Sequence, residues 1–353
     1  MRTELRSIGA REIDPLLDQQ WSTLVSSTSA ASIFHSPAWL QALYQTYGYK
    51  PVALTTSDAG GAPRSGLLFC RVESWLSGRR LVSLPFSDHC EPLALGLDDF
   101  LALLDALKAA ARSSGCKYIE IRPLSFVLPV ECGLEPSRCL CHHMLDLSPT
   151  PAELFGAFHK DCVQRKIRRS EREGLTYEEG GSPDLVRKFY HLQTLTRRRK
   201  QLPPQPFAWF QNLAECMGNK LKIRIASKDG KPVASILTLQ DRNTLVYKYG
   251  CSDKVLSNLG GTQLLFWRAI QDAKDLGLSA FDLGVSDWED EGLIRFKDRL
   301  GATRSAVTYW RYPASSVAKG GAKWKLKAAK RLFSCLPSSL LPTVGRLLYR
   351  HVA

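Results

Sequence analysis

The sequence lacks the features that mark several common protein classes. It contains no C-x-x-C pair, no G-x-S-x-G serine-hydrolase motif and no Walker-type phosphate-binding loop. It has no apolar run near the ~18 residues that span a bilayer. Its first residues show no apolar core of a secretory signal. We therefore expect a cytoplasmic protein whose ten cysteines are reduced and mostly buried.

One short run has ligand types that suit zinc. It reads C-L-C-H-H at residues 139–143. On a strand, alternation points Cys139 and Cys141 to one face and the two histidines to opposite faces. We therefore predict no metal site, and no tightly bound cofactor.

Composition and charge describe a folded protein with a basic end. The 353 residues are 44% hydrophobic and 23% charged, which excludes disorder and suggests two domains. The net charge of +14 favours anionic partners such as phosphates, nucleic acid or a membrane surface. Residues 314–353 contain eight lysines and arginines and no acid, so the tail is far more basic than the body.

The chain contains an internal echo: the same order of predicted elements occurs twice, at a nearly constant offset in residue number. Each copy has a β-hairpin, an amphipathic helix closed by glycine and a short strand. We therefore predict an α+β fold with similar domains at residues 1–150 and 151–313, followed by the basic tail. The elements are expected at residues 51–72, 99–112 and 117–122 in the first copy and at 221–239, 262–276 and 279–284 in the second, which adds a strand at 244–249.

A basic helix is expected between the two copies, over residues 151–174. Thr150 and Glu153 fit a capping box, Pro151 fits the first helical position and Gly174 fits the end. At helical spacing, Lys160, Gln164 and Arg168 share one face, and Arg165, Arg169 and Arg172 an adjacent one. The stripe is either a solvated helix face or an anchor for phosphates.

The second copy carries a specific series of motifs. They are Y-x-Y-x-x-S from Tyr247, N-x-G-G from Asn258, F-D-x-G-x-S from Phe281 and F-K-x-x-x-G from Phe296. In this order they resemble the FemAB-like acyltransferases of the GNAT superfamily, which contain two tandem GNAT-type domains. The resemblance extends to F-H-S-P-A-W at residues 34–39, to the basic helix and to residues 197–210. Residues 71–88 and 336–350 look most similar to the subgroup that accompanies exosortase and extracellular-polysaccharide systems.

The resemblance implies an enzyme that transfers an acyl or aminoacyl group to an amine. The donor would be acyl-CoA or aminoacyl-tRNA, and the acceptor a glycan or peptide precursor of the cell envelope or of an exported polysaccharide. The protein would then act in the cytoplasm, peripherally at the inner membrane face. The alternative is a non-catalytic phosphate-binding or scaffolding relative with the same fold.

The resemblance implies that the donor's pyrophosphate binds at the start of the helix that follows the fourth strand of a GNAT-type domain. Helix N-termini offer unpaired backbone N–H groups and a favourable dipole to anions. The residues concerned are Asn258, Gly260, Gly261 and Thr262. The superfamily pattern Q/R-x-x-G-x-G/A is replaced here by S-x-x-G-x-T, which weakens the case for acyl-CoA. The alternative is a capped helix without a ligand.

Two residues are the catalytic candidates. Lys297 matches the lysine of F-K-x-x-x-G and would stabilise charge that develops at the transferring carbonyl; otherwise it is a surface lysine. Asp282 would orient the attacking amine or accept its proton; otherwise it is structural. Tyr247 and Tyr249 share one strand face by alternation and would line the acyl channel or pack the core. The acceptor is expected in the cleft between the domains, on residues Lys160, Arg165, Arg168 and Arg199.

The basic tail allows three interpretations. Residues 322–333 combine Trp324, Leu332 and Phe333 with lysines and Arg331. This composition fits an interfacial helix on anionic lipid, a tRNA-binding segment, or a tail docked on the domain.

Overall fold

The computed structural model describes residues 9–57, 61–75, 78–313 and 341–351. These residues form two compact units. The first comprises residues 9–138, 307–313 and 348–351, and the second residues 139–306 and 341–347. The chain leaves the first unit inside strand β6 (Glu135–Asp146), before the boundary expected after residue 150, and returns inside β12 (Thr303–Tyr312). The predicted membrane or RNA segment at 322–333 lies outside the described residues.

The first unit contains a sheet with the order β1-β2-β3-β4-β5-β12. Its neighbouring strands are antiparallel except for β4 and β5, which are parallel. Helix α3 packs on β2 and β3 through leucines at positions 103, 104 and 107, which recur at helical spacing. The elements are β1 (Arg11–Ile13), α1 (Gln19–Ser27), η1 (Ile33–His35), α2 (Pro37–Tyr47), β2 (Lys50–Ser57), β3 (Pro63–Val72), β4 (Arg80–Val82), α3 (Leu97–Ser113), β5 (Ile119–Ile121) and η2 (Val130–Cys132).

The second unit repeats this order of strands. Its sheet runs β6-β11-β10-β9-β8-β7, and its one parallel pair within the described ladders is β10 with β11. The elements are α4 (Pro151–Ala157), the π-helical turn η3 (Lys160–Gln164), α5 (Arg165–Arg172), β7 (Thr176–Gly180), α6 (Pro183–Arg199), α7 (Phe207–Met217), η4 (Gly218–Lys220), β8 (Leu221–Lys228), β9 (Lys231–Asp241), β10 (Thr244–Ser252), η5 (Ser257–Leu259), α8 (Gly261–Asp275), β11 (Ala280–Ser286), α9 (Glu291–Asp298) and α11 (Leu341–Tyr349), whose last two residues belong to the first unit.

The duplicated α+β fold predicted from the echo is therefore confirmed. In each copy an antiparallel trio leads through one helix to a strand that pairs parallel with the last of the three. The strand beside β5 is β12, from the end of the second copy. The strand beside β11 is β6, from the end of the first copy. Sequence position alone does not reveal this exchange of β6 and β12.

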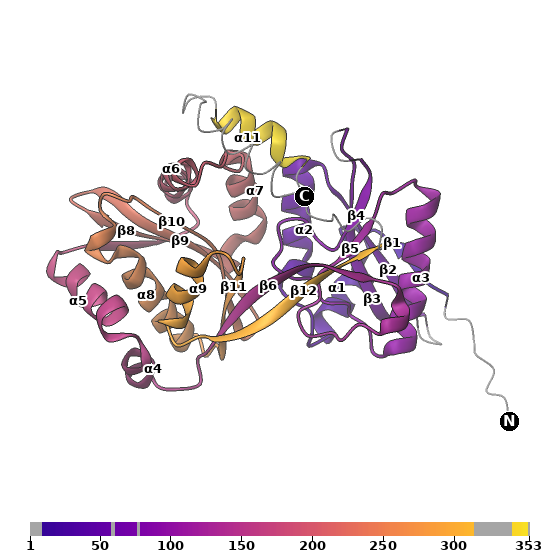
Figure 1. Cartoon of the computed structure of the whole chain (residues 1–353), viewed down its shortest axis with the longest axis horizontal. Coiled ribbons are helices and arrows are strands. Elements are labelled where there is room, and N and C mark those ends of the chain that lie inside the picture. The colour runs from indigo at the N-terminus through magenta and orange to yellow at the C-terminus, as the bar shows by residue number, and fades with distance from the viewer. Residues whose placement is uncertain (1–8, 58–60, 76–77, 314–340, 352–353) are drawn as a thin grey trace. The chain divides into compact units, whose positions relative to one another are not determined.

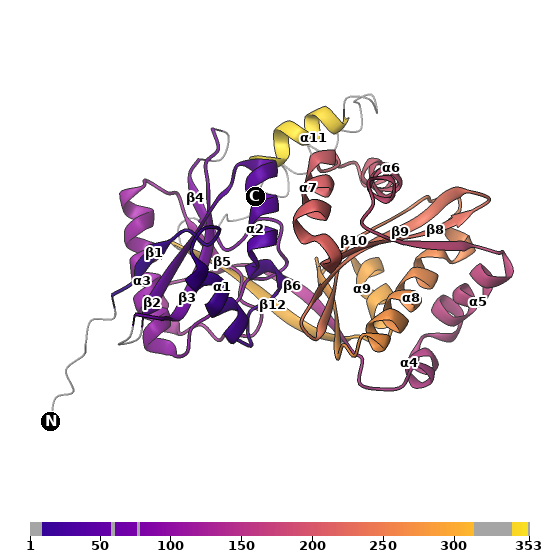
Figure 2. The same cartoon turned by 180° about the vertical axis from the view of Figure 1, so that it is seen from behind.

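Two layers of helices enclose the sheet of the second unit. Helix α8 lies on one face of β8–β10, with α9 beside it on β11, and α6 and α7 lie on the other face (Figures 1 and 2). The α8 face buries an apolar cluster that includes Phe158, Leu265, Phe266 and Phe281. Within the described ranges, no helix is long and apolar enough to cross a bilayer.

The basic helix expected at 151–174 is interrupted. Its start is as predicted, because Thr150 and Glu153 form a capping box. The α-helix then ends at Ala157, and the chain resumes through a π-helical turn at Lys160. The break occurs because the backbone N–H of His159 donates to the carbonyl of Arg299 (2.9 Å) instead of continuing the helix. One uninterrupted helix over this range is therefore a wrong prediction.

Candidate functional site

The candidate site lies where strands β10 and β11 stop pairing. Their parallel ladder covers only Thr244–Val246 against Ala280–Asp282. Strand β10 then continues to Ser252 and β11 to Ser286 without mutual pairing. Both strands also have an irregular register at this point, in β10 after Tyr247 and in β11 after Asp282. Bulges of this kind redirect side chains and often adjoin active sites.

Asp282 is fixed at the point of divergence. It is 2% exposed, and its Oδ1 accepts from His142 Nε2 (2.8 Å) and from the backbone N–H of Gly284 (2.7 Å). Gly284 adopts a φ of 69°, which glycine tolerates best. The carboxylate therefore braces the irregular segment of β11.

Lys297 reaches the same segment from helix α9. Its Nζ donates to the carbonyls of Gly284 (2.9 Å) and Val285 (3.4 Å), and the residue is 2% exposed. The interpretation of Lys297 as a surface lysine is therefore wrong. Its ammonium is held in a buried, low-dielectric setting, where charge acts more strongly than in water.

His142 is a site residue that sequence reasoning missed. It comes from β6, whose register places it opposite Val285. Besides its contact with Asp282, its Nδ1 lies 3.4 Å from Ser305 Oγ. From the sequence, we considered His142 only as a zinc ligand, because its partner Asp282 is 140 residues away. The two residues come together only because β6 pairs with β11, and no sequence pattern indicates that pairing.

The neighbouring histidine has different partners. His143 is fully buried, and its Nε2 lies 3.2 Å from Asp298 Oδ1. Burial lowers the pKa of His143, and a side-chain hydrogen bond from Arg304 lowers the pKa of Asp298. In the described part of the chain, no three histidine, cysteine or acidic residues are grouped to hold a metal.

The two tyrosines of the predicted acyl channel face opposite sides of the sheet. Tyr247 packs on Phe266 of α8 (ring centroids 4.9 Å apart), whereas Tyr249 packs on Phe210 of α7 (5.3 Å). Trp209 Nε1 donates to the Tyr249 hydroxyl (2.9 Å). The register shift between the tyrosines breaks the period of two, so the prediction that they share one face is wrong.

The start of α8 combines an uncapped helix end with tight packing. Gly260 precedes the helix with a φ of 86° and provides no side-chain cap. A Cβ at Gly260 would lie 2.1 Å from the carbonyl oxygen of Lys166, and one at Gly261 would lie 3.3 Å from Val233 and Ala234. Lys166 Nζ also donates to the carbonyl of Asn258 (2.9 Å). Gly260 is therefore required for packing, independently of any ligand, whereas a Cβ at Gly261 would need its neighbours to shift by only a few tenths of an ångström.

The basic residues predicted to bind phosphate are exposed and do not converge as one group. Arg165 lies 3.5 Å from Asp161, and Arg168 donates to Gln164 Oε1 (3.4 Å). Together with Lys160 they lie on the η3–α5 segment, where α5 packs against α8. Arg199 lies apart, at the end of α6, where it donates to the carbonyl of Ser252 at the end of β10 (3.3 Å).

Comparison with protein families points to the region that contains Asp282 and Lys297. Residues 159–298 match the family model described as an acetyltransferase (GNAT) domain. The match contains β10, α8, β11 and Lys297, and it excludes His142 on β6. No curated protein matches the chain in sequence.

Solved structures are similar to nearly the whole chain. FemX is 13% identical with a TM-score of 0.66, covering 90% of this chain and 99% of that one. L-PGS from Bacillus licheniformis is 16% identical with a TM-score of 0.56, covering 92% and 98%. A tandem GNAT protein from the clavulanic acid biosynthesis pathway is 10% identical with a TM-score of 0.55, covering 86% and 98%. The chain thus has a two-domain GNAT architecture, with a fold similar to that of FemX.

Proposed function

We propose that this protein transfers an acyl group from acyl-CoA to an amine. The observation that carries the proposal is the divergence of β10 and β11 beside a buried aspartate and a buried lysine, inside the region that matches the GNAT domain. An acyl chain needs a slot with backbone groups along its walls, and we propose that β10 and β11 form one where they stop pairing. The chemistry therefore belongs at Asp282 and Lys297.

The start of α8 is the proposed phosphate site of the donor. Residues Gly261 and Thr262 open the helix, where backbone N–H groups and the helix dipole favour a pyrophosphate. Two cations lie next to the connecting loop: Arg199 of α6, which donates to the carbonyl of Ser252 at the end of β10, and Lys166, which donates to the carbonyl of Asn258. In this arrangement the donor extends from α8 along β11 and places its thioester carbonyl near Asp282.

The reaction joins the amine nitrogen to the carbonyl carbon and breaks the carbon–sulfur bond. Asp282 orients the amine and accepts its proton, and the thiolate of coenzyme A leaves and is protonated. Lys297 offsets the negative charge that develops on the carbonyl oxygen. His142 donates to Asp282 and so sets the direction of the carboxylate.

The acceptor is proposed to be an amine on a cell-envelope or exported-polysaccharide precursor. FemX and a lysylphosphatidylglycerol synthetase domain share the fold, and the second name denotes a lipid product. Phosphates on such an acceptor would meet Lys160, Arg165 and Arg168, which are exposed on the η3–α5 segment. Action at the inner membrane face and a link to exosortase systems follow from the resemblance alone and remain predictions.

The test is a donor screen with the full chain. Labelled acetyl-CoA, longer acyl-CoAs and, separately, aminoacyl-tRNAs are incubated with an amine pool, and both thermal stabilisation and label transfer are recorded. We expect stabilisation and transfer with an acyl-CoA. Transfer from aminoacyl-tRNA alone would show that the donor is aminoacyl-tRNA and not acyl-CoA. Stabilisation without any transfer would favour the non-catalytic scaffolding function.

A further inference from the structure

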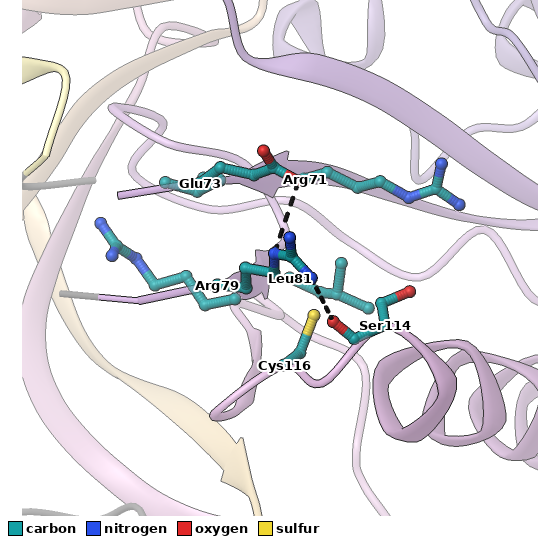
Figure 3. Close-up of a pocket in the computed structure, with 8 residues that line it drawn as sticks. Arg71, Glu73, Arg79, Leu81, Ser114 and Cys116 are labelled. Carbon is teal, nitrogen blue, oxygen red and sulfur yellow. Dashed lines mark hydrogen bonds and ion pairs between the residues drawn. The ribbon is translucent and has the colours of Figure 1, made fainter. Parts of the chain in front are cut away.

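Two adjoining cavities lie in the first unit, outside the region that matches the GNAT domain. One has a volume of about 340 Å³ and lies under β3 and β4, with Ser114 and Cys116 at the end of α3 (Figure 3). The other, about 330 Å³, lies between the end of α2 and the start of β2. Arg71 and Glu73 line both. The two cavities therefore adjoin at these two residues, and we refer to them together as the recess.

The recess is rich in cations. Its lining contains Lys50, Arg71, Arg79, Arg80 and Arg350 against the single carboxylate of Glu73. Lys50 and Arg350 are exposed, and no carboxylate of the described residues pairs with either. Arg79 donates to the carbonyl of Ser114 (3.4 Å) and lies 3.8 Å from the carboxylate of Glu73. Both side chains of the ion pair are exposed, so the pair neutralises little charge.

Two of the cations are directly opposed across the sheet. Lys50 on β2 is the register partner of Arg71 on β3, so both side chains lie on one face of the ladder. Opposed like charges destabilise a sheet. Arg71 donates to both carboxylate oxygens of Glu12, at 2.8 and 2.7 Å, which offsets part of its charge and of this repulsion. The charge of Lys50 has no such partner among the described residues, and an anion in the recess would compensate it.

The third cation, Arg350, is held in place by the two residues on either side of it. Tyr49 donates to the carbonyl of Tyr349 (2.9 Å), and the buried Arg80 donates to the carbonyl of His351 (3.0 Å). The residues on either side of Arg350 are thus anchored to this unit. Arg350 Nη2 lies 4.0 Å from where a Cβ on Gly48 would be, at the rim of the second cavity.

We propose that this recess binds a phosphate group of a ligand, by Lys50, Arg71 and Arg350. Arginine and lysine suit phosphate because they combine positive charge with several N–H donors. The volume of each cavity accommodates a phosphate with part of the molecule that carries it. The site is separate from the proposed donor site at α8 and goes beyond the proposed transfer reaction.

The test compares Lys50→Ala and Arg350→Ala with Arg112→Ala, an exposed arginine of the same unit that lines neither cavity. Pyrophosphate binding is measured by calorimetry, and vesicles of phosphatidylglycerol or phosphatidylcholine by co-sedimentation, all with the full chain. We expect each of the first two variants to weaken binding about tenfold, the loss of one charged hydrogen bond, and Arg112→Ala to bind as the unmodified protein does. Any binding at α8 is common to all variants and does not affect the comparison.

The outcomes separate the sources of the phosphate. Weakened pyrophosphate binding indicates a soluble phosphorylated ligand, whereas weakened retention on phosphatidylglycerol alone indicates a lipid headgroup. We also expect Lys50→Ala to unfold at the same temperature or higher without ligand, because it removes the opposed charge. No binding of either probe, or binding unchanged in both variants, would overturn the proposal whether or not transfer activity is found.

Discussion

At the scale of single residues, the site depends on buried polar groups that hold one another. Asp282 receives hydrogen bonds from His142 and Gly284, and Lys297 donates to the carbonyls of Gly284 and Val285. The sequence suggested Asp282 and Lys297 because they stand in motifs. It could not suggest the position of His142, because no local pattern records which distant strand lies beside β11.

The first prediction concerns His142 as a positioning residue. Replacing it in His142→Ala removes one donor from Asp282 and leaves the carboxylate free to turn. We expect kcat to fall about tenfold to a hundredfold while the KM for the donor changes little. His142→Gln should restore part of the rate, because its amide can donate. Equal losses in both variants together with a lowered unfolding temperature would assign His142 a structural role only.

The second prediction concerns the pH dependence of stability. His35 is fully buried, its Nδ1 accepts from the Ser32 N–H (3.0 Å), and burial lowers its pKa from 6.5 to about 4. Between these values the unfolded chain binds a proton that the folded protein does not. The free energy of unfolding should therefore fall as the pH falls through this window, by about 3 kcal/mol from this residue.

Urea denaturation between pH 4 and 7.5 measures this slope. The slope should shrink in His35→Asn and persist in His191→Asn, since His191 is exposed. A slope that is the same in the His35 variant and in the unmodified protein would contradict the assignment to His35.

At the scale of elements, local patterns predicted the hairpins, α3, α8 and the capping box at Thr150. They failed where tertiary contacts decide. The helix after residue 151 breaks because His159 bonds to Arg299, and Tyr247 and Tyr249 separate because β10 changes register between them. Neither the hydrogen bond of His159 nor the register change in β10 alters the periodicity of the sequence, so neither could be predicted from it.

The third prediction tests the junction of α5 with α8. Gly260→Ala places a Cβ 2.1 Å from the Lys166 carbonyl oxygen, in addition to the cost of a left-handed backbone. Gly277→Ala carries the backbone cost alone, because nothing lies within 4 Å of its Cβ. The free energy of unfolding should fall by about 1–2 kcal/mol for Gly277→Ala and by clearly more for Gly260→Ala. Similar losses would show that α5 moves away without cost.

At the scale of the whole molecule, each copy of the fold takes one strand, β6 or β12, from the other copy's part of the chain. Strand β6 precedes the second copy in sequence but completes its sheet beside β11, and it contributes Leu145 to the apolar cluster there. The internal echo predicted two similar domains. It did not predict this strand, because each copy was assumed to use its own residues.

The fourth prediction concerns fragments of the second copy. A fragment of residues 151–313 lacks β6 and leaves β11 without its antiparallel neighbour. We expect this fragment to show no cooperative thermal transition, whereas residues 139–313 should unfold cooperatively. The measurement is circular dichroism on heating. A cooperative transition of the shorter fragment would contradict the role given to β6.

The most direct test of the proposed function is acyl transfer by Asp282→Asn. Asparagine keeps the size of the side chain but removes the charge that would orient the amine and accept its proton. Label transfer from acyl-CoA to an amine is followed in the full chain, with Asp275→Asn, an exposed aspartate on α8, as the control. We predict at least a hundredfold loss of rate for Asp282→Asn, with the control unchanged and both variants folded. Full activity of Asp282→Asn would contradict the account.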